Sequence, residues 1–479
     1  MEAVLHDAGV EPGIARFYEE RAGDLIWTQR GRPTAAAISG LDALARADRT
    51  LGGVARRSPA LETAWSEALS GRANGTVLAR FDALLSAAVV RLVQETRKPE
   101  GLLVVDPAAL APAPSAGTIL AQVAADPTDT AAIERLIRPH GDYAALEAAL
   151  SVWRTRWKDL PEISIASGAA TRPGQIDPRA SRLRTRLGLD PRQGERMDPD
   201  LVARLRSFQI WHGLEPTGVL DDVAVEALNR PPGAFERQIQ VNLRRLRALP
   251  PDQGVRYLKV NIAAAELSAV EGGIEVRRMP VIVGRPNMPT PEMAGMIRYA
   301  VLTPYWNIPM DLVRGQIAPA VQRGGREAFD ARDLEALADW SPSPKRLEPD
   351  EIDWEAIAAG AARVRLRQKP GPRNMMGRAK FIFPNDVGIY LHDTPDKHLF
   401  GRERRFLSAG CVRVADAAWL GRWLLGRDLD EAASGRAEEK INLPRPVPVY
   451  LLYQTVTPRA GGGLVVHPDP YGRDALDPG

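Results

Sequence analysis

The only cysteine of the 479-residue chain is Cys411. A single cysteine cannot form a disulfide within the chain, so its thiol is either a small buried side chain or a reactive group. His392 precedes it by 19 residues. An ordinary thiol is mostly protonated at neutral pH, and an imidazole can remove its proton because histidine titrates in that range. The pair therefore predicts acyl transfer, with Cys411 as the nucleophile and His392 as the base.

The residues next to this pair have features that such a reaction needs. His392 stands at the expected end of a strand, and the backbone carbonyl of Asp393 in the following turn can hold the imidazole in one tautomer. Gly410 allows the backbone to turn tightly before Cys411. We expect the N–H groups of Gly410 and Cys411 to point to the same place as the sulfur and to form an oxyanion hole.

Five further side chains are candidate contacts for the substrate. Arg413 and Arg405 have the forked shape that binds carboxylates, and an internal salt bridge that braces the loop is the alternative for both. Tyr390 and Trp306 are expected to line the pocket, with core packing as the alternative for Trp306. Ser408 is expected to support the loop by hydrogen bonding and to lie at the substrate site.

These candidates lie in the part of the chain where the spacing of apolar residues changes from helical to extended. Leu258, Val260 and Ile262 lie on one face of an alternating stretch, which is typical of a half-buried strand. A helical segment rich in charged residues and proline, at about 311–370, is expected to be a lid or a decorating subdomain. The surrounding residues, 255–455, are expected to form a mainly β catalytic domain with strands at 256–262, 276–283, 297–302, 380–383, 388–392 and 447–453.

The rest of the chain has helical patterns, so the fold class is multidomain α+β. Residues 1–165 are rich in Ala, Leu and Arg at helical spacing, which predicts a helical scaffold domain. Residues 175–232 form a shorter helical unit, and their stretch 208–221 resembles the small three-helix peptidoglycan-binding domain attached to many cell-wall enzymes. Each residue of that stretch also has a packing role, so the pattern indicates a fold better than a ligand. Residues 456–479 are expected to be a C-terminal tail.

A more specific resemblance covers residues 255–455. They are similar to the catalytic domain of the L,D-transpeptidases, the YkuD-type fold. The signature of that family is a histidine, a spacer in the upper teens, and then Ser/Thr-His-Gly-Cys followed by an apolar residue and Arg or Asn. His392 and residues 408–413 match this signature. The larger periplasmic members also share the order of the domains and four flanking stretches, at 283–286, 303–309, 366–372 and 392–395.

The resemblance implies a reaction on the stem peptides of a bacterial cell wall. Cys411 attacks the carbonyl of the third residue of a stem tetrapeptide, the terminal D-Ala leaves, and the side-chain amine of a neighbouring stem resolves the thioester to give a 3→3 crosslink. His392 takes the thiol proton and later relays the amine proton. The resemblance implies no cofactor and no metal. It implies stem peptides as partners, a role in wall organisation and cell shape, and reaction with carbapenems.

One position departs from the family pattern. The family usually has histidine directly before the Gly-Cys pair, and this chain has Ala409. The loss of a polar side chain near the thiolate leaves two alternatives open. One is an L,D-carboxypeptidase or amidase-like hydrolase, in which water resolves the thioester, and the other is a non-catalytic peptidoglycan-binding scaffold. His398 is a candidate substitute for the missing histidine.

The composition argues against several other classes of protein. The chain has 63 basic and 60 acidic residues, a net charge of +3, which is too even to indicate nucleic-acid binding. No run of about 18 apolar residues predicts a membrane-spanning helix. Residues 1–4 lack the basic and apolar regions of a signal peptide, so a periplasmic location is inferred from the substrate. The acceptor amine and the oligomeric state stay open.

Overall fold

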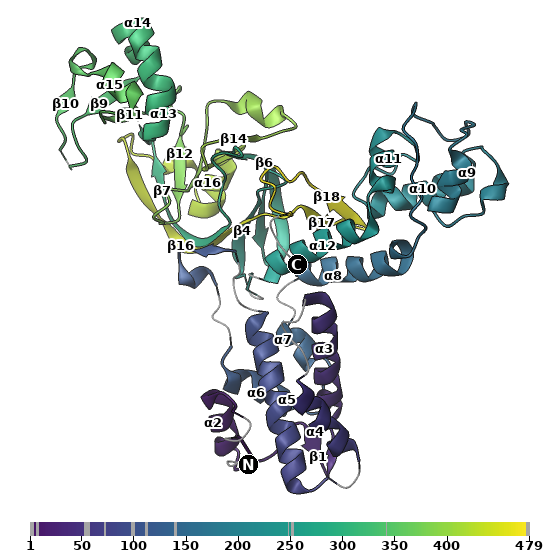
Figure 1. The fold of residues 1–479 in the computed structure, drawn as a ribbon. Helices are drawn as coiled ribbons and strands as arrows, with labels where there is room; N and C mark the ends of the chain where they lie inside the picture. Colours follow the sequence, from purple (N-terminus) through teal and green to yellow (C-terminus); the bar gives the residue numbers. More distant parts are fainter. Residues whose placement is uncertain are drawn as a thin grey trace. The chain divides into compact units, whose positions relative to one another are not determined.

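The computed structural model describes residues 4–5, 9–51, 58–70, 73–96, 101–110, 114–137, 141–247, 249–250, 253–341 and 343–475. The chain divides into two compact units, and each is described by itself. Unit 1 comprises Met1–Leu102, Leu110–Gln253 and Tyr453–Gly479, and unit 2 comprises Leu103–Ala109 and Gly254–Leu452. Unit 1 is mainly helical and unit 2 mainly β, so the α+β class predicted from the sequence is confirmed (Figure 1).

The first part of unit 1 is helical, as the spacing of its apolar residues predicts. Ser58, Asn74 and Ser115 each accept a hydrogen bond from a backbone N–H three residues later, and these caps fix where three of the helices begin. The apolar faces of the helices within residues 12–137 share one buried core. The helices are α2 (Pro12–Glu20), α3 (Ala35–Leu51), α4 (Pro59–Leu69), α5 (Gly75–Glu95), α6 (Ala116–Ala125), α7 (Ala132–Ile137) and α8 (Gly141–Trp153), with a short hairpin of β1 (Thr28–Gln29) and β2 (Arg32–Pro33).

The second part of unit 1 contains the three helices expected within residues 175–232. The turn between the second and third of these helices is fixed by buried Gln209, which accepts from the Gly218 N–H at 2.8 Å and donates to the Val219 carbonyl at 3.1 Å. Gly218 has a φ of +72°, which favours glycine. The helices are α9 (Ala180–Arg186), α10 (Pro199–Trp211) and α11 (Asp222–Asn229), and α12 (Pro232–Arg247) follows them.

The last residues of the chain are an ordered part of unit 1. Strands β17 (Val456–Pro458) and β18 (Leu464–Val466) form a hairpin that contacts α8, α10 and α12. Asp474 accepts hydrogen bonds from Arg245 at 2.8 Å and from Gln238 at 2.9 Å. The segment predicted as a tail therefore completes the packing of unit 1.

Unit 2 is built around a sheet that closes on itself. Its strands follow the order β12-β13-β15-β6-β5-β4-β16-β7, and β7 also pairs with β12. In β4 the alternation predicted from the sequence is seen directly, because Leu258 and Val260 are buried and their neighbours are less so. Helix α16 (Ala417–Leu425) packs against β16 and β12. The strands are β4 (Arg256–Asn261), β5 (Glu266–Glu271), β6 (Ile274–Gly284), β7 (Met293–Leu302), β12 (Ala379–Ile382), β13 (Leu391–His392), β15 (Val412–Val414) and β16 (Glu439–Leu452).

The insertion expected at about 311–370 contains both helices and strands. Helices α13 (Met310–Leu312), α14 (Ala318–Asp330) and α15 (Trp354–Ala359) contribute to a small apolar core. A sheet in the order β10-β9-β11-β8 accompanies them, and the sequence analysis did not predict it. These strands are too short to show an alternating pattern: β8 (Trp306–Asn307), β9 (Leu334–Leu337), β10 (Arg346–Leu347) and β11 (Arg365–Gln368).

Two segments depart from the predicted domain boundaries. Residues 453–455 were predicted in the catalytic domain but belong to unit 1. Residues 1–165 are predicted to form a single helical domain, but Leu103–Ala109 groups with unit 2. The reason is backbone pairing, because β3 (Leu103–Val104) adds to β7 as a parallel strand. Across the described residues, no helix combines the length and the apolar character that a membrane span needs.

Candidate active site

Two neighbouring strands bring the predicted nucleophile and base together. β13 and β15 pair in parallel, with Leu391 opposite Val412 and His392 opposite Arg413. The Val412 N–H donates to the Tyr390 carbonyl at 3.1 Å, which extends this register by one residue. Because alternate residues share a face of a sheet, Tyr390 and His392 project to the same side as Cys411 and Arg413. The sequence separation of 19 residues is thus closed by strand pairing.

His392 has the environment of a neutral base. Its ring is buried, and Nδ1 lies 2.5 Å from the backbone carbonyl oxygen of Asp393. Burial, reinforced by the charge of Arg413, lowers the pKa of His392 to about 3. A carbonyl can only accept, so Nδ1 carries the proton and Nε2 keeps its lone pair. Among the described residues Nε2 has no hydrogen-bond partner, so it is free to take a proton.

Cys411 is partly exposed, which suits a group that must meet a substrate. Its thiol donates to the Gly388 carbonyl at 3.4 Å. Burial of the sulfur raises the thiol pKa, and hydrogen bonds from the Tyr390 backbone N–H and hydroxyl act in the opposite direction. The charges of Arg413 and Lys380 also favour the thiolate. The resting site therefore holds a neutral thiol that needs a base to become nucleophilic.

The loop before Cys411 is held by hydrogen bonds from a buried serine. Ser408 Oγ donates to the Cys411 carbonyl at 2.6 Å and accepts from the Gly410 N–H at 3.1 Å. Gly410 has a φ of +111°, and an added Cβ would approach Ile389 Cδ1 to 3.1 Å. The Gly410 carbonyl accepts from buried Thr290 at 2.7 Å. Ser408 thus fixes the loop, as predicted, and its hydroxyl is already used there.

The predicted oxyanion hole needs a correction. The Gly410 N–H is bonded to Ser408 Oγ, so it does not point to the place where an oxyanion would form. The Cys411 N–H has no hydrogen-bond partner within the described part of the chain, and it fits the predicted role. The Tyr390 N–H, which faces the sulfur, is a second donor that the sequence analysis missed.

The two candidate arginines have different surroundings. Arg405 donates to the backbone carbonyls of Val281, Ala264, Ala265 and Arg402 at 3.0–3.3 Å. The guanidinium group of Arg405 is therefore already occupied. Arg405 braces the loop, as in the alternative to substrate binding, but through backbone carbonyls and not through a salt bridge to a carboxylate. Arg413 Nη1 lies 3.6 Å from Asp396, while its buried Nε has no partner among the described residues. Arg413 keeps donor capacity beside the nucleophile and makes the site electropositive.

Of the remaining candidate side chains, one lies at the site and the others do not. Tyr390 packs edge-on against the His392 ring at 5.7 Å, so it does line the site. Trp306 lies in β8 and packs against the core of the insertion, which is the packing alternative. The Asp393 carboxylate faces away from the imidazole toward Lys397 Nζ at 2.6 Å and the Arg378 N–H at 2.9 Å. His398 is exposed.

Sequence reasoning missed two residues that shape the site. Lys380 pairs with His392 across β12 and β13, and its Nζ lies 3.2 Å from Glu438. Thr290 also accepts from the Gly284 N–H at 2.9 Å, which ties the end of β6 to the nucleophile loop. A Lys in a strand and a Thr in a loop carry no signal of their own, because only the closed sheet brings them to Cys411.

Comparisons with known proteins support the family resemblance that was predicted from the residues around Cys411. Residues 255–451 match the family model of the L,D-transpeptidase catalytic domain, and residues 12–150 match a scaffold domain. A Haemophilus influenzae protein provisionally named an L,D-transpeptidase is 30% identical over 244 residues, which cover 50% of this chain and 48% of that protein. The match therefore spans about half of the length of this curated relative.

Solved structures of L,D-transpeptidases are more distant. The structure from Mycobacterium smegmatis is 13% identical with a TM-score of 0.21, and it covers 41% of this chain and 58% of its own. The structure from Xylanimonas cellulosilytica is 15% identical with a TM-score of 0.19. The match covers 60% of this chain and 98% of the chain in that structure. These scores are too low to add support. The resemblance predicted from His392 and residues 408–413 is confirmed by the family match: residues 255–451 match the L,D-transpeptidase catalytic domain.

Proposed function

We propose that the chain is a peptidoglycan L,D-transpeptidase that works through a thioester on Cys411. The observation that carries the proposal is the placement of His392, whose Nδ1 is held by the Asp393 carbonyl while Nε2 has no partner among the described residues. A base in this state can accept the proton of the neutral thiol on the same face of the sheet.

In the proposed first step, the sulfur forms a bond to the carbonyl carbon of the third stem residue. Nε2 of His392 takes the thiol proton, and the N–H groups of Cys411 and Tyr390 stabilise the oxyanion. The C–N bond to the terminal D-Ala then breaks, and the proton passes from His392 to the departing amine. The product of this step is a thioester and free D-Ala.

In the proposed second step, the side-chain amine of another stem attacks the thioester. His392 accepts the amine proton and returns it to the sulfur as the C–S bond breaks. The result is a 3→3 crosslink and a regenerated thiol. The positive charges of Arg413 and Lys380 would attract the carboxylates that stem peptides carry.

The proposed substrate places the protein in the periplasm and makes it a target of carbapenems, which acylate the same thiol. Residues 175–232 are proposed to bind the wall, and residues 255–455 to perform the reaction. Ala409 does not remove either backbone donor, because the oxyanion contacts come from main-chain N–H groups. Transfer is therefore preferred over the non-catalytic alternative.

The test is incubation of the full chain with a disaccharide-tetrapeptide, followed by mass spectrometry of the products. We expect a crosslinked dimer and free D-Ala. A tripeptide without dimer would support the hydrolase alternative. His398→Ala is a matched control for His392→Ala, because both remove a histidine from the same stretch and His398 is exposed. Equal activity of the two variants would contradict the role of His392.

A further inference from the structure

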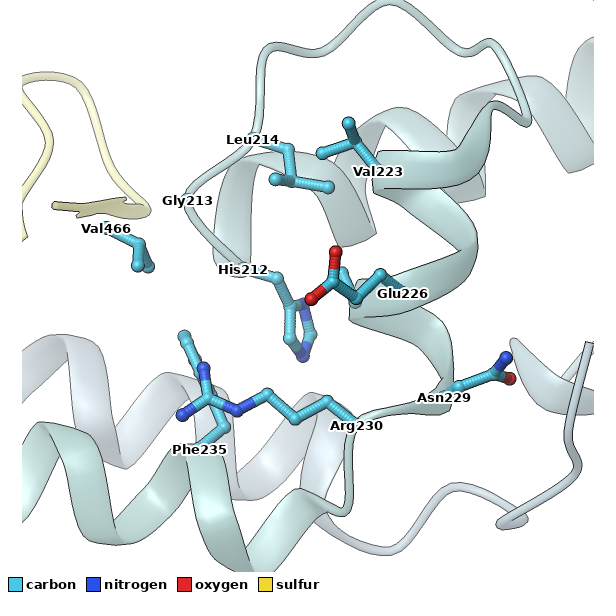
Figure 2. A pocket seen from close by; sticks show the side chains of 10 residues that line it. His212, Gly213, Leu214, Val223, Glu226, Asn229, Arg230, Phe235 and Val466 are labelled. Carbon is cyan, nitrogen blue, oxygen red and sulfur yellow. The ribbon is translucent and has the colours of Figure 1, made fainter. Parts of the chain in front are cut away.

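Unit 1 contains a pocket of about 680 Å³ beside α10 and α11. Its apolar wall is formed by Leu214, Val223, Phe235 and Val466 (Figure 2). Small-molecule sites in proteins typically have about 300–1,000 Å³, with mostly apolar walls and a few polar groups. The size and lining of the pocket are therefore those of a ligand site.

Two polar side chains at this pocket are occupied by structural contacts. His212 Nδ1 lies 2.8 Å from the Phe208 carbonyl, and its Nε2 accepts from Trp153 Nε1 at 3.2 Å. Asn229 accepts from the Ile165 N–H at 2.7 Å and donates to the Ile165 carbonyl at 2.8 Å. Both ring nitrogens of His212 are therefore used, and the bonds to Ile165 use one donor and one lone pair of the Asn229 amide.

Glu226 and Arg230 are different. Both extend from the α11 segment into the space beside His212 (Figure 2). Arg230 follows the last residue of α11 and has an extended backbone, and within the described residues neither side chain forms an ion pair or a hydrogen bond. Arg230 instead lies over the Phe235 ring, 5.2 Å from its centroid. Burial lowers the pKa of Arg230, and the charges of Asp474 and Glu226 offset only part of this desolvation cost.

We propose that this pocket binds a zwitterionic amino acid or short peptide. The carboxylate of the ligand would bind the Arg230 fork, its amine would bind Glu226, and its aliphatic part would pack on the apolar wall. Glu226 disfavours a ligand with only negative charge, such as phosphate. The proposal deepens the wall-binding role proposed for residues 175–232, and its failure would leave the reaction proposed at Cys411 untouched.

The test is calorimetric titration of the full chain with two probes, free meso-diaminopimelate and the tripeptide L-Ala-γ-D-Glu-meso-diaminopimelate. Arg230→Gln is expected to weaken binding about tenfold or more, because a charge-assisted bond is lost. Arg237→Gln is the matched control, since Arg237 is exposed on α12 and does not line the pocket. It should leave affinity unchanged within about twofold. Preference for one probe distinguishes the free amino acid from the peptide as the ligand.

A second arm tests the amine. Glu226→Gln should weaken binding of the unmodified probe but not of a probe acetylated on both of its free amines. The thermal midpoint of Arg230→Gln should equal or exceed that of the wild type, because an unpaired charge has been removed. The proposal is overturned by no binding of either probe at millimolar concentration, by equal binding to the wild type and Arg230→Gln, or by equal weakening in Arg237→Gln.

Discussion

Two histidines, one half-buried in unit 1 and one buried in unit 2, are held in a similar way through Nδ1. His212 and His392 both place Nδ1 against a backbone carbonyl, of Phe208 in one case and of Asp393 in the other. Burial lowers the pKa of each to about 3. The difference lies at Nε2, which accepts from Trp153 in His212 and has no partner among the described residues in His392.

The comparison shows that neither burial nor a shifted pKa identifies a catalytic histidine. His212 also stacks on Phe208 and Phe235, with centroids 3.7 and 4.9 Å away, so its ring is part of a packed aromatic cluster. In the part of the chain that the structure describes, Nε2 of His392 has no hydrogen-bond partner, and the ring shares a face of the sheet with a thiol. A free acceptor beside a nucleophile is the feature that separates a base from a packing residue.

The largest difference should appear when each histidine is removed in turn. His392→Ala should lower the rate of crosslinking about 10²–10⁴-fold, which is the usual contribution of a general base. His212→Ala should leave the rate per folded molecule within a few-fold. The measurement is the initial rate of dimer formation, corrected for the folded fraction by circular dichroism. A large loss of rate in folded His212→Ala would contradict the assignment of His212 as a packing residue.

The second prediction concerns the pH dependence of thiol reactivity. Burial raises the pKa of Cys411, and His392 stays neutral down to a pH of about 3. Alkylation by iodoacetamide should therefore rise about tenfold per pH unit through neutrality and continue to rise above pH 9. Because Cys411 is the only cysteine, the labelled site is unambiguous. A plateau between pH 6 and 8 would indicate a thiolate–imidazolium pair and contradict the neutral resting site.

The third prediction concerns stability. His212→Phe keeps an aromatic ring but leaves Trp153 Nε1–H without its acceptor, which should cost about 1–3 kcal/mol. The wild-type histidine prefers the neutral form in the folded state, so its contribution is full above pH 6.5 and is lost as the pH falls toward 3. Urea denaturation at pH 7 and pH 5 measures both effects. His212→Phe should be less sensitive to this acidification than the wild type.

The smallest effect is expected at Asp393. Its backbone carbonyl holds His392, whereas its carboxylate bonds Lys397 and the Arg378 N–H. Asp393→Asn keeps the carbonyl and should change the crosslinking rate by less than about tenfold, with the larger effect on stability. A loss as large as that of His392→Ala would show that the carboxylate itself orients the imidazole.

The sequence predicted the parts of the site that depend on local chemistry. Cys411 preceded by Gly410, and His392 at the end of a strand, carry their own signals, and the predicted Asp393 carbonyl contact is present. The prediction for the Gly410 N–H was wrong because Ser408 Oγ competes for the same donor. The position of Lys380 depends on which strands pair, and a sequence pattern does not determine that pairing.

The same distinction applies to the fold. Strand β4 was predicted from alternation, residues 297–302 of β7 were also expected to form a strand, and the helices were predicted from the spacing of their apolar residues. The two-residue strands of the insertion and β3 have no such pattern, because backbone pairing with distant segments alone defines them. The role of Arg405 could not be predicted for the same reason. Its guanidinium group donates hydrogen bonds to four carbonyls, which come from two distant segments and from its own loop.

The central claim is that Cys411 becomes acylated with His392 as its base. Its most direct test is intact-protein mass spectrometry after brief mixing with a disaccharide-tetrapeptide donor and no acceptor. We expect a mass increase equal to the donor less D-Ala, located on the peptide that contains Cys411, absent in Cys411→Ala and much slower to form in His392→Ala. An adduct at another residue, or an undiminished adduct in Cys411→Ala, would contradict the account.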